Sequence, residues 1–182
     1  CTEAAAAGAK LLVLPEAFVY YGQKDLTAAA DSESVDAGPA RCTLSALAKR
    51  LNAWIVGGTL PLWPENGDRS GRPNAACLVF DGRGREVGRY DKIHLFDVDL
   101  PKQNRRYRES DIYRPGEGDV LVLDSPVGRI GVMVCFDVRF PGLALKLRER
   151  GVEVIVIPAA FTRETGRSHW RLLLQARALD TQ

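Results

Sequence analysis

The sequence predicts an α/β protein in which mixed β-sheets are covered by helices. Three observations support this fold class: helix and strand patterns alternate along the chain, two β-hairpin signals lie between them, and apolar residues alternate within the strand segments. The hairpins indicate two sheets that face each other, because a plain series of strand–helix–strand units would contain none. With 182 residues, the chain is long enough for one domain with a substantial core.

The first part of the chain alternates helix and strand signals. An alanine-rich helix over Thr2–Lys10 leads into an apolar strand over Leu11–Leu14. Apolar side chains at helical spacing predict a helix over Arg41–Leu51. A run rich in Trp, Ile and Val predicts a strand over Ala53–Leu60, and Pro, Gly, Asn and Asp mark Pro61–Pro73 as a connecting loop.

Two hairpins are predicted in the middle of the chain. The strands Asn74–Phe80 and Arg85–Asp91 flank a turn that contains Asp and two glycines. The strands Val120–Asp124 and Arg129–Cys135 flank a second turn with Pro and Gly. The polar stretch between the hairpins, Ile93–Asp119, is predicted to be one long loop, and loops of this length are commonly functional.

The last part of the chain returns to helix and strand in turn. A helix is predicted over Gly142–Arg150, with its end at Gly151. The fully apolar run Val152–Ile157 predicts a buried strand. The final helix is expected to begin at Ser168 or His169.

Composition narrows the class of partner. Hydrophobic residues make up 46% and charged residues 26% of the chain, as in ordinary globular proteins. The formal net charge of +2 is too small to indicate nucleic acid, and no apolar run approaches the about 20 residues of a membrane helix. We therefore expect no nucleic-acid and no membrane partner. The one basic cluster, Arg105–Arg108, is predicted to be a solvated loop.

The four cysteines do not form a metal-binding or disulfide pattern. There is no C-x-x-C pair and the chain has two histidines, so a zinc site is not expected. Cys42 and Cys77 lie in a helix and a strand pattern, and both are predicted to be small buried hydrophobic residues. We expect a reduced, cytoplasmic chain without an export signal.

Three chemically different groups follow strand patterns. Glu16 follows the strand Leu11–Leu14, Lys92 follows Arg85–Asp91, and Cys135 ends an apolar run before a sharp polar turn. The ends of strands in an α/β core are a common place for catalytic side chains. A lone cysteine after a strand is more often packed in a core, so the interpretation depends on the three groups lying together.

Together, the three groups suit acyl transfer from a carbon–nitrogen bond. Glu16 would take the proton of the Cys135 thiol, and the sulfur would attack the amide carbon. The Lys92 ammonium and the Phe136 backbone N–H would hold the oxyanion, and water would hydrolyse the thioester. An ion pair between Asp137 and Arg139 is expected to hold the turn, although Arg139 could instead contact substrate.

The amino-acid sequences of these segments resemble the three signature motifs of the nitrilase superfamily of carbon–nitrogen hydrolases. The matching motifs are Leu-Pro-Glu-Ala-Phe (14–18), Tyr-Asp-Lys-Ile-His-Leu-Phe-Asp (90–97) and Val-Cys-Phe-Asp-Val-Arg-Phe-Pro (134–141). The segments 157–162, 166–170 and 177–182 are also similar to that family, so the resemblance covers essentially the whole chain.

The resemblance implies an α-β-β-α sandwich that pairs into a homodimer, with no metal or organic cofactor. It identifies Glu16, Lys92 and Cys135 as the catalytic triad and Glu109 as a second glutamate beside the lysine. The predicted oxyanion and substrate-binding residues are Phe136, Arg139, Tyr21 and Phe161. The branch resembles omega-amidases and deaminated glutathione amidases, which implies a small carboxylate-bearing amide as substrate.

The chain also departs from that branch, and alternatives remain open. Arg171 and Gly142 stand where glutamate is usual, and Arg171 was expected near the pocket. Residues 1–182 are interpreted as one domain that is truncated at both ends, without its first strand and its C-terminal segment. The alternatives are an inactive binding or scaffold module, a nitrilase or carbamoyl-amide hydrolase of the same superfamily, and a metal-dependent phosphoesterase.

Overall fold

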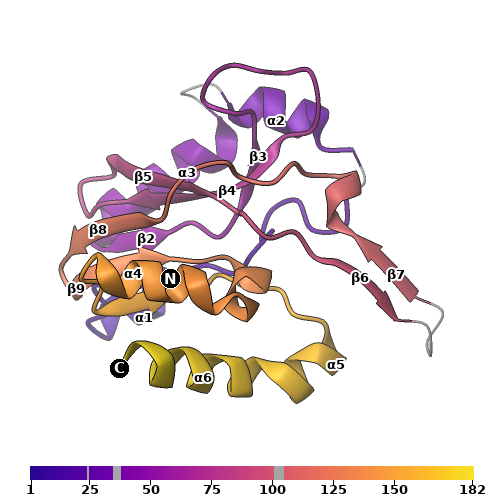
Figure 1. The fold of residues 1–182 in the computed structure, drawn as a ribbon. Coiled ribbons are helices and arrows are strands. Elements are labelled where there is room, and N and C mark those ends of the chain that lie inside the picture. The colour runs from indigo at the N-terminus through magenta and orange to yellow at the C-terminus, as the bar shows by residue number, and fades with distance from the viewer. Residues whose placement is uncertain (24, 35–37, 101–104) are drawn as a thin grey trace.

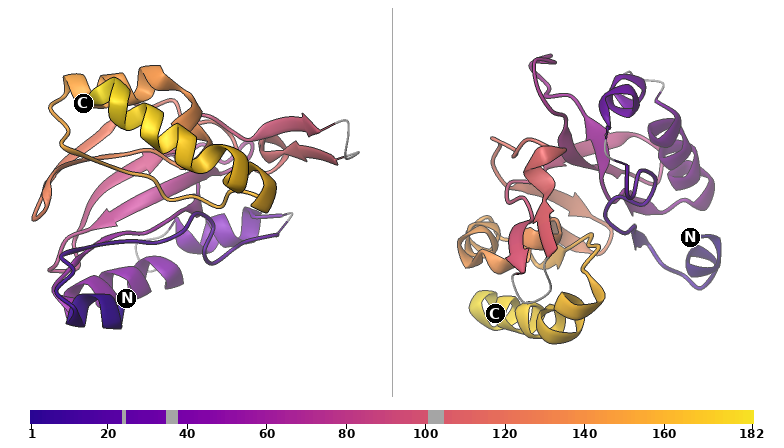
Figure 2. Two further views of the ribbon diagram at one scale, coloured as in Figure 1. Left: turned by 90° about the horizontal axis from the view of Figure 1, so that it is seen from below. Right: turned by 90° about the vertical axis from the view of Figure 1, so that its right-hand side faces the viewer.

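The computed structural model describes residues 1–23, 25–34, 38–100 and 105–182. In this part of the chain, two main β-sheets face each other and helices cover their outer sides (Figures 1 and 2). The architecture is therefore the predicted α-β-β-α sandwich, and its order of layers is helices, sheet, sheet, helices.

The first sheet contains both parallel and antiparallel pairs. Its strands are β1 (Leu11–Val13), β2 (Trp54–Val56), β3 (Leu60–Leu62), β4 (Asn74–Phe80) and β5 (Glu86–Asp91). Strand β1 runs parallel to β2, whereas β4 is antiparallel to β2, β3 and β5. The helices on this side of the molecule are α1 (Thr2–Ala6), α2 (Thr27–Glu33) and α3 (Pro39–Leu51).

The second sheet is smaller. Its strands are β8 (Leu121–Ser125), β9 (Gly128–Val132) and β10 (Val154–Val156), with β9 in the middle. Strand β9 is antiparallel to β8 and parallel to β10. Its outer helices are α4 (Pro141–Glu149), α5 (Arg163–Thr165) and α6 (Arg171–Thr181), and a π-helical turn, Gly166–Trp170, joins the last two.

Strand β4 shows why the layers form. All seven of its residues are buried, because each of its faces packs against a different layer. Ala76, Leu78 and Phe80 lie in the core cluster with α3, whereas Cys77 and Val79 lie in the cluster that includes the second sheet. The two-residue period of a strand sends alternate side chains into these two cores.

The predicted hairpins are confirmed, but the strand Ala53–Leu60 is wrong. The chain turns between β2 and β3, so Leu60–Leu62 forms a strand of its own beside β4. Gly58 has a φ of +61°, and a Cβ at this position would collide with the Pro15 carbonyl. Because glycine permits this backbone and this close approach, the run reverses instead of continuing.

The predicted long loop Ile93–Asp119 is also wrong in part. It contains a two-stranded hairpin of β6 (Asp97–Leu100) and β7 (Arg105–Arg108), which projects from the sandwich in Figure 1. A 3-10 turn, Glu109–Asp111, follows it. The basic cluster at 105–108 is therefore a strand rather than a solvated loop, because its backbone pairs with Asp97–Leu100.

Two further predictions differ from the structure. Helix α2 was not predicted, and α1 ends at Ala6 because Gly8 takes a φ of +93°. Cys77 is buried as predicted, whereas Cys42 is exposed. Among the described helices, none has the length and apolar character that crossing a bilayer requires.

Candidate active site

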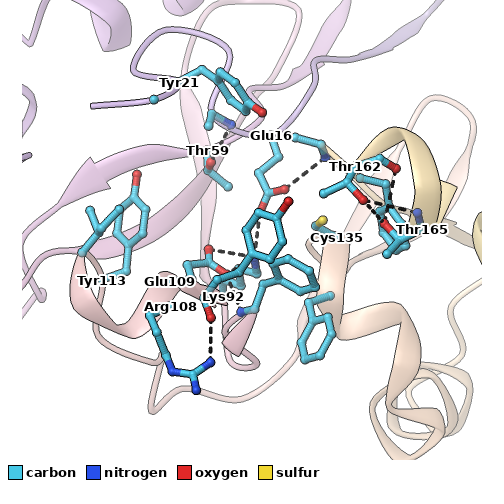
Figure 3. A pocket seen from close by; sticks show the side chains of 18 of the residues that line it. Glu16, Tyr21, Thr59, Lys92, Arg108, Glu109, Tyr113, Cys135, Thr162 and Thr165 are labelled. Carbon is cyan, nitrogen blue, oxygen red and sulfur yellow. Dashed lines mark hydrogen bonds and ion pairs between the residues drawn. The ribbon is translucent and has the colours of Figure 1, made fainter. Parts of the chain in front are cut away.

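The pocket lies where strand ends of the two facing sheets meet (Figure 3). Glu16 follows β1 and Lys92 follows β5 in the first sheet, whereas Cys135 follows β9 in the second. These three residues come from distant stretches of sequence, and all of them line one cavity of about 370 Å³. The predicted convergence at strand ends is therefore present.

Lys92 is the centre of the charged group. Its side chain is 1% exposed, and its Nζ lies 2.7 Å from Glu16 Oε1. The same Nζ lies 2.8 Å and 2.7 Å from Glu109 Oε1 and Oε2. Burial lowers the pKa of Lys92, but the charges of Glu16 and Glu109 outweigh it and raise the pKa above its usual value. The side chain is therefore a fixed ammonium at neutral pH.

Both carboxylates are also held by backbone N–H groups. The Ala160 N–H donates to Glu16 Oε2 at 3.1 Å, and the Phe96 N–H donates to Glu109 Oε2 at 2.6 Å. Burial raises the pKa of Glu109, while the neighbouring Lys92 opposes this shift. Two carboxyl groups of the pocket thus contact one buried ammonium group.

Cys135 sits on a strained turn. Its φ is +46°, a conformation that residues other than glycine rarely adopt, and its N–H donates to the Pro158 carbonyl at 2.8 Å. Burial raises the pKa of the Cys135 thiol, the charge of Glu16 raises it further, and Lys92 opposes both. The resting sulfur is therefore a protonated thiol, and its attack on a substrate requires a base.

The Phe136 N–H is well placed to receive an oxyanion. Cys135–Arg139 forms a 3-10 turn, and the first N–H groups of a helical turn have no acceptor inside it. The Cys135 N–H is used by Pro158 and the Asp137 N–H by Val134. The N–H between them belongs to Phe136, whose residue lines the cavity.

All eight residues predicted for the site line this cavity. They are Glu16, Tyr21, Lys92, Glu109, Cys135, Phe136, Arg139 and Phe161. Sequence reasoning missed the other lining residues, which are Ala17, Gly22, Thr59, Phe96, Tyr107, Arg108, Ile112, Tyr113, Ala160, Thr162 and Thr165. The β6–β7 hairpin supplies Tyr107 and Arg108, and the alternation of arginine with tyrosine at 106–108 was the available signal for a strand.

Two arginines line the cavity, and their interaction partners differ. Arg108 Nη2 binds the Asp99 carboxylate at 2.8 Å and 2.6 Å. Arg139 lies over the rings of Phe136 and Phe161, at 5.4 Å and 5.7 Å from the ring centroids. No carboxylate of the described residues pairs with Arg139, and its buried Nε has no hydrogen-bond partner there. Arg139 is thus the lining guanidinium with capacity for an anion.

The predicted ion pair between Asp137 and Arg139 is wrong. The Asp137 carboxylate instead accepts hydrogen bonds from Tyr90, His94 and the Val134 backbone. The side chain of Asp137 is fully buried and does not line the cavity that Arg139 lines.

The two histidines have structural contacts. The His94 ring stacks on Phe140 with a centroid separation of 3.5 Å. Arg139 Nη2 lies 3.1 Å from His169 Nδ1, which must accept because a guanidinium only donates. The π-helical turn that carries His169 also places Trp170 against Phe161, at 4.8 Å between ring centroids.

Neither of the two unusual positions lines the cavity. Arg171 is exposed at the start of α6 and is not one of the residues that line the pocket. Gly142 is exposed in the first turn of α4, and a Cβ there would meet nothing within 4 Å. Among the residues that the structure describes, no His, Cys, Asp and Glu side chains are grouped so that they could hold a metal ion.

A four-layer sandwich with Cys, Lys and Glu in one pocket is the architecture of nitrilase-like proteins. The model of the carbon-nitrogen hydrolase family matches residues 1–182, and the chain belongs to this family.

Curated relatives agree with this assignment. The chain is 45% identical over 151 residues to a protein of Yersinia enterocolitica named deaminated glutathione amidase, covering 83% of this chain and 52% of that protein. It is 40% identical over 184 residues to the chloroplastic omega-amidase of Arabidopsis thaliana, covering 99% and 48%. The chain thus spans about half the length of these curated relatives.

Solved structures share the fold. Nit3 of Saccharomyces cerevisiae, described as a member of branch 10 of the nitrilase superfamily, aligns with a TM-score of 0.77 and 31% identity, covering 94% of this chain and 59% of that one. A mutant amidase from Nesterenkonia sp. AN1 aligns with a TM-score of 0.76 and 26% identity, covering 97% and 63%. That structure is described as showing Michael addition of acrylamide at the active site cysteine.

Proposed function

We propose that the protein is an amidase that cleaves a small carboxylate-bearing amide to an acid and ammonia through a thioester. The observation that carries this proposal is the contact of Lys92 Nζ with Glu16 at 2.7 Å in the cavity that Cys135 lines. The names of the curated relatives support an amide as substrate.

In the first half of the reaction, Glu16 takes the proton of the Cys135 thiol as the sulfur attacks the amide carbon. A base is needed because the pKa of the Cys135 thiol is raised, chiefly by burial. The negative charge that develops on the amide oxygen is held by the Lys92 ammonium and the Phe136 N–H, and each such donor contributes about 3 kcal/mol. Glu16 then gives its proton to the leaving ammonia.

In the second half, the same carboxylate removes a proton from water, which attacks the thioester. The tetrahedral intermediate uses the same two oxyanion donors, and its collapse releases the acid and returns the proton to the Cys135 sulfur. Glu109 keeps the Lys92 ammonium in place with two contacts of 2.7 and 2.8 Å. Every step therefore uses groups of the chain and one water molecule.

Arg139 is the proposed binding group for the substrate carboxylate. It lines the cavity between the rings of Phe136 and Phe161, and it has no carboxylate partner among the described residues. A guanidinium can bind a carboxylate with two parallel hydrogen bonds. Tyr21, which is exposed at the opening of the cavity, would then border the far end of the substrate.

We further propose a homodimer in the cytoplasm, with residues 1–182 as one domain. Leu172 and Leu179 support a subunit interface, because they are 65% and 78% exposed and lie seven residues apart on α6. The four free cysteines support a reducing compartment. Light scattering during gel filtration would give the mass, and Leu172→Glu with Leu179→Glu should convert a dimer to monomers.

The proposed activity is tested by ammonia release from 2-oxoglutaramate, 2-oxosuccinamate and deaminated glutathione. The protein is assayed at its natural length, beside Cys135→Ala with an unchanged circular dichroism spectrum. We expect turnover of at least one amide by the wild type and none by Cys135→Ala. Equal release by both proteins would refute the cysteine mechanism, and no release by either would favour a binding module.

A further inference from the structure

We infer that Asp137 is a positioning residue that sets the relation between the Lys92 amine and the Cys135 sulfur. The inference rests on the proposed function, because it assigns a role within that reaction. Asp137 is fully buried two residues after Cys135 and does not line the cavity. It acts through the residues around it, so it is not itself a catalytic residue.

The Asp137 carboxylate joins the two halves of the site. Its Oδ2 accepts from the Tyr90 hydroxyl at 2.8 Å and from the Val134 N–H at 2.9 Å. Its Oδ1 accepts from the His94 N–H at 3.0 Å and from His94 Nδ1 at 2.7 Å. Tyr90 and His94 stand two residues before and after Lys92, whereas Val134 immediately precedes Cys135. One side chain thus ties both flanks of the lysine to the backbone beside the nucleophile.

The donors of this cluster are fixed by chemistry. An ionised carboxylate only accepts hydrogen bonds, so His94 Nδ1 carries a proton and donates it. Burial raises the pKa of Tyr90, and Asp137 raises it further, so the tyrosine also stays a donor. The stacking of His94 on Phe140 fixes the orientation of the imidazole ring. All four groups therefore donate hydrogen bonds to the two oxygens of Asp137.

Because of this hydrogen-bond pattern, the isosteric variant Asp137→Asn is a specific test of the role of the carboxylate. Each oxygen of Asp137 accepts one backbone N–H, from His94 on one side and from Val134 on the other. Either orientation of an asparagine amide places its NH₂ group against one of these N–H groups. A hydroxyl or an imidazole can change its donor role, but a backbone N–H cannot. Asp137→Asn should therefore push the lysine segment and the cysteine turn apart without changing side-chain volume.

The matched control is another buried aspartate, on the β4–β5 hairpin that leads to Lys92. Asp81 is 5% exposed and accepts from the Arg83 and Arg85 N–H groups at 2.9 Å and 3.0 Å. It lies in the turn between β4 and β5, at the end of β5 opposite Lys92. Asp81→Asn should thus perturb a buried carboxylate with backbone donors while leaving the pocket alone.

The first experiment compares kcat, KM and melting temperature of the two variants at natural chain length. We expect Asp137→Asn to lose about 100-fold in kcat with KM within threefold, because a misplacement of about 1 Å costs that much in rate. Asp81→Asn should lower the melting temperature because it loses the ion pair with Arg85, and it should keep kcat within twofold. The inference is overturned if Asp137→Asn retains wild-type kcat, or if both variants lose the same turnover.

A second pair of variants decides the matter if Asp137→Asn does not fold. His94→Asn and His94→Ala both remove the stacking on Phe140, but the asparagine keeps an N–H near the position of Nδ1. We expect kcat of His94→Asn to be at least fivefold above that of His94→Ala at equal melting temperature. Equal kcat values would show that the contact with Asp137 does not position the site.

Alkylation separates failure of this inference from failure of the proposed function. If the wild type releases no ammonia from any amide, the amidase proposal fails, but the rate of iodoacetamide addition to Cys135 still reports how strongly the charge of Lys92 acts on the thiol. Asp137→Asn should slow this addition severalfold at pH 8, because a displaced Lys92 no longer favours the thiolate. An unchanged rate in Asp137→Asn, measured by mass spectrometry beside Asp81→Asn, would overturn the inference.

Discussion

Two of the regions that hold carboxylates away from solvent differ in how the carboxylates are satisfied. At the start of α3, the fully buried Glu33 accepts from the Tyr20 hydroxyl at 2.8 Å and from two N–H groups, of Ala40 at 2.9 Å and Arg41 at 3.2 Å. Uncharged donors and the positive end of the helix dipole satisfy this single acid. These contacts stabilise the start of a helix.

In the pocket, the buried acids face a cation instead. Glu16 and Glu109 both contact Lys92 Nζ, and Cys135 lies in the same cavity. Two carboxyl groups share one buried ammonium group in a pocket that also holds a thiol. The comparison shows that burial of charge alone does not mark an active site. A buried ammonium group shared by two acids beside a nucleophile is the more specific sign.

The largest effect should follow from removing the shared cation. Lys92→Met leaves two carboxylates facing each other in a buried site, so we expect the free energy of unfolding to fall by about 3–5 kcal/mol. Loss of the oxyanion donor should reduce kcat by about 100- to 1,000-fold. Ammonia release and urea denaturation measure the two effects.

A double variant separates stability from catalysis at Lys92. Lys92→Met combined with Glu109→Gln removes the facing charges, so stability should partly recover while turnover stays lost. Recovery of turnover in the double variant would contradict the assignment of Lys92 to the oxyanion.

The second effect concerns the pH dependence of the Cys135 thiol. Burial and then the charge of Glu16 raise the pKa of Cys135 above the usual value of about 8.5. The rate of alkylation at Cys135 should therefore keep rising above pH 9. Glu16→Gln removes one cause of the raised pKa, so the profile should move to lower pH. Mass spectrometry measures both, with the exposed Cys42 as the internal reference; a plateau below pH 8 in the wild type would contradict this.

A smaller effect is expected at the region around Glu33. Glu33→Gln keeps one acceptor oxygen but loses the charge, so the free energy of unfolding should fall by about 1–3 kcal/mol. Burial and then Glu33 raise the pKa of Tyr20 to about 12, so the variant should shift this pKa back toward 10. Urea denaturation and ultraviolet titration of the tyrosine test these points, and kcat should stay within twofold. A tenfold loss of kcat would show that this region also serves catalysis.

Much of the site could be predicted because its signals are local. Glu16, Lys92 and Cys135 each follow an apolar strand pattern, and strand ends of two facing sheets meet at one edge. The hairpins were predictable for the same reason, since turn residues and alternating apolar residues stand next to each other in sequence. The sequence around Glu109, however, indicates an acidic residue on the surface. Only the family resemblance predicted that Glu109 lies beside the lysine.

The remaining features depend on contacts between distant residues. The reversal at Gly58 requires the carbonyl of Pro15, which approaches it in space. The partner of Asp137 was predicted to be its near neighbour Arg139, but it is His94, 43 residues earlier in the chain. Cys42 lies about 200° around the helix from Leu44, so it faces solvent although its neighbour faces the sheet.

The smallest effect should come from Gly142, which does not line the pocket. It is exposed as the second residue of α4, whose first turn has no acidic residue, and a side chain there has open space. Gly142→Glu removes an unfavourable glycine from a helix and adds a negative charge near its positive end, so the free energy of unfolding should rise by up to about 1 kcal/mol. Gly142→Ala serves as the control that isolates the contribution of the charge. Because neither variant alters the balance of charges around Lys92, kcat should not change, and a change above twofold would show that this helix start influences the pocket.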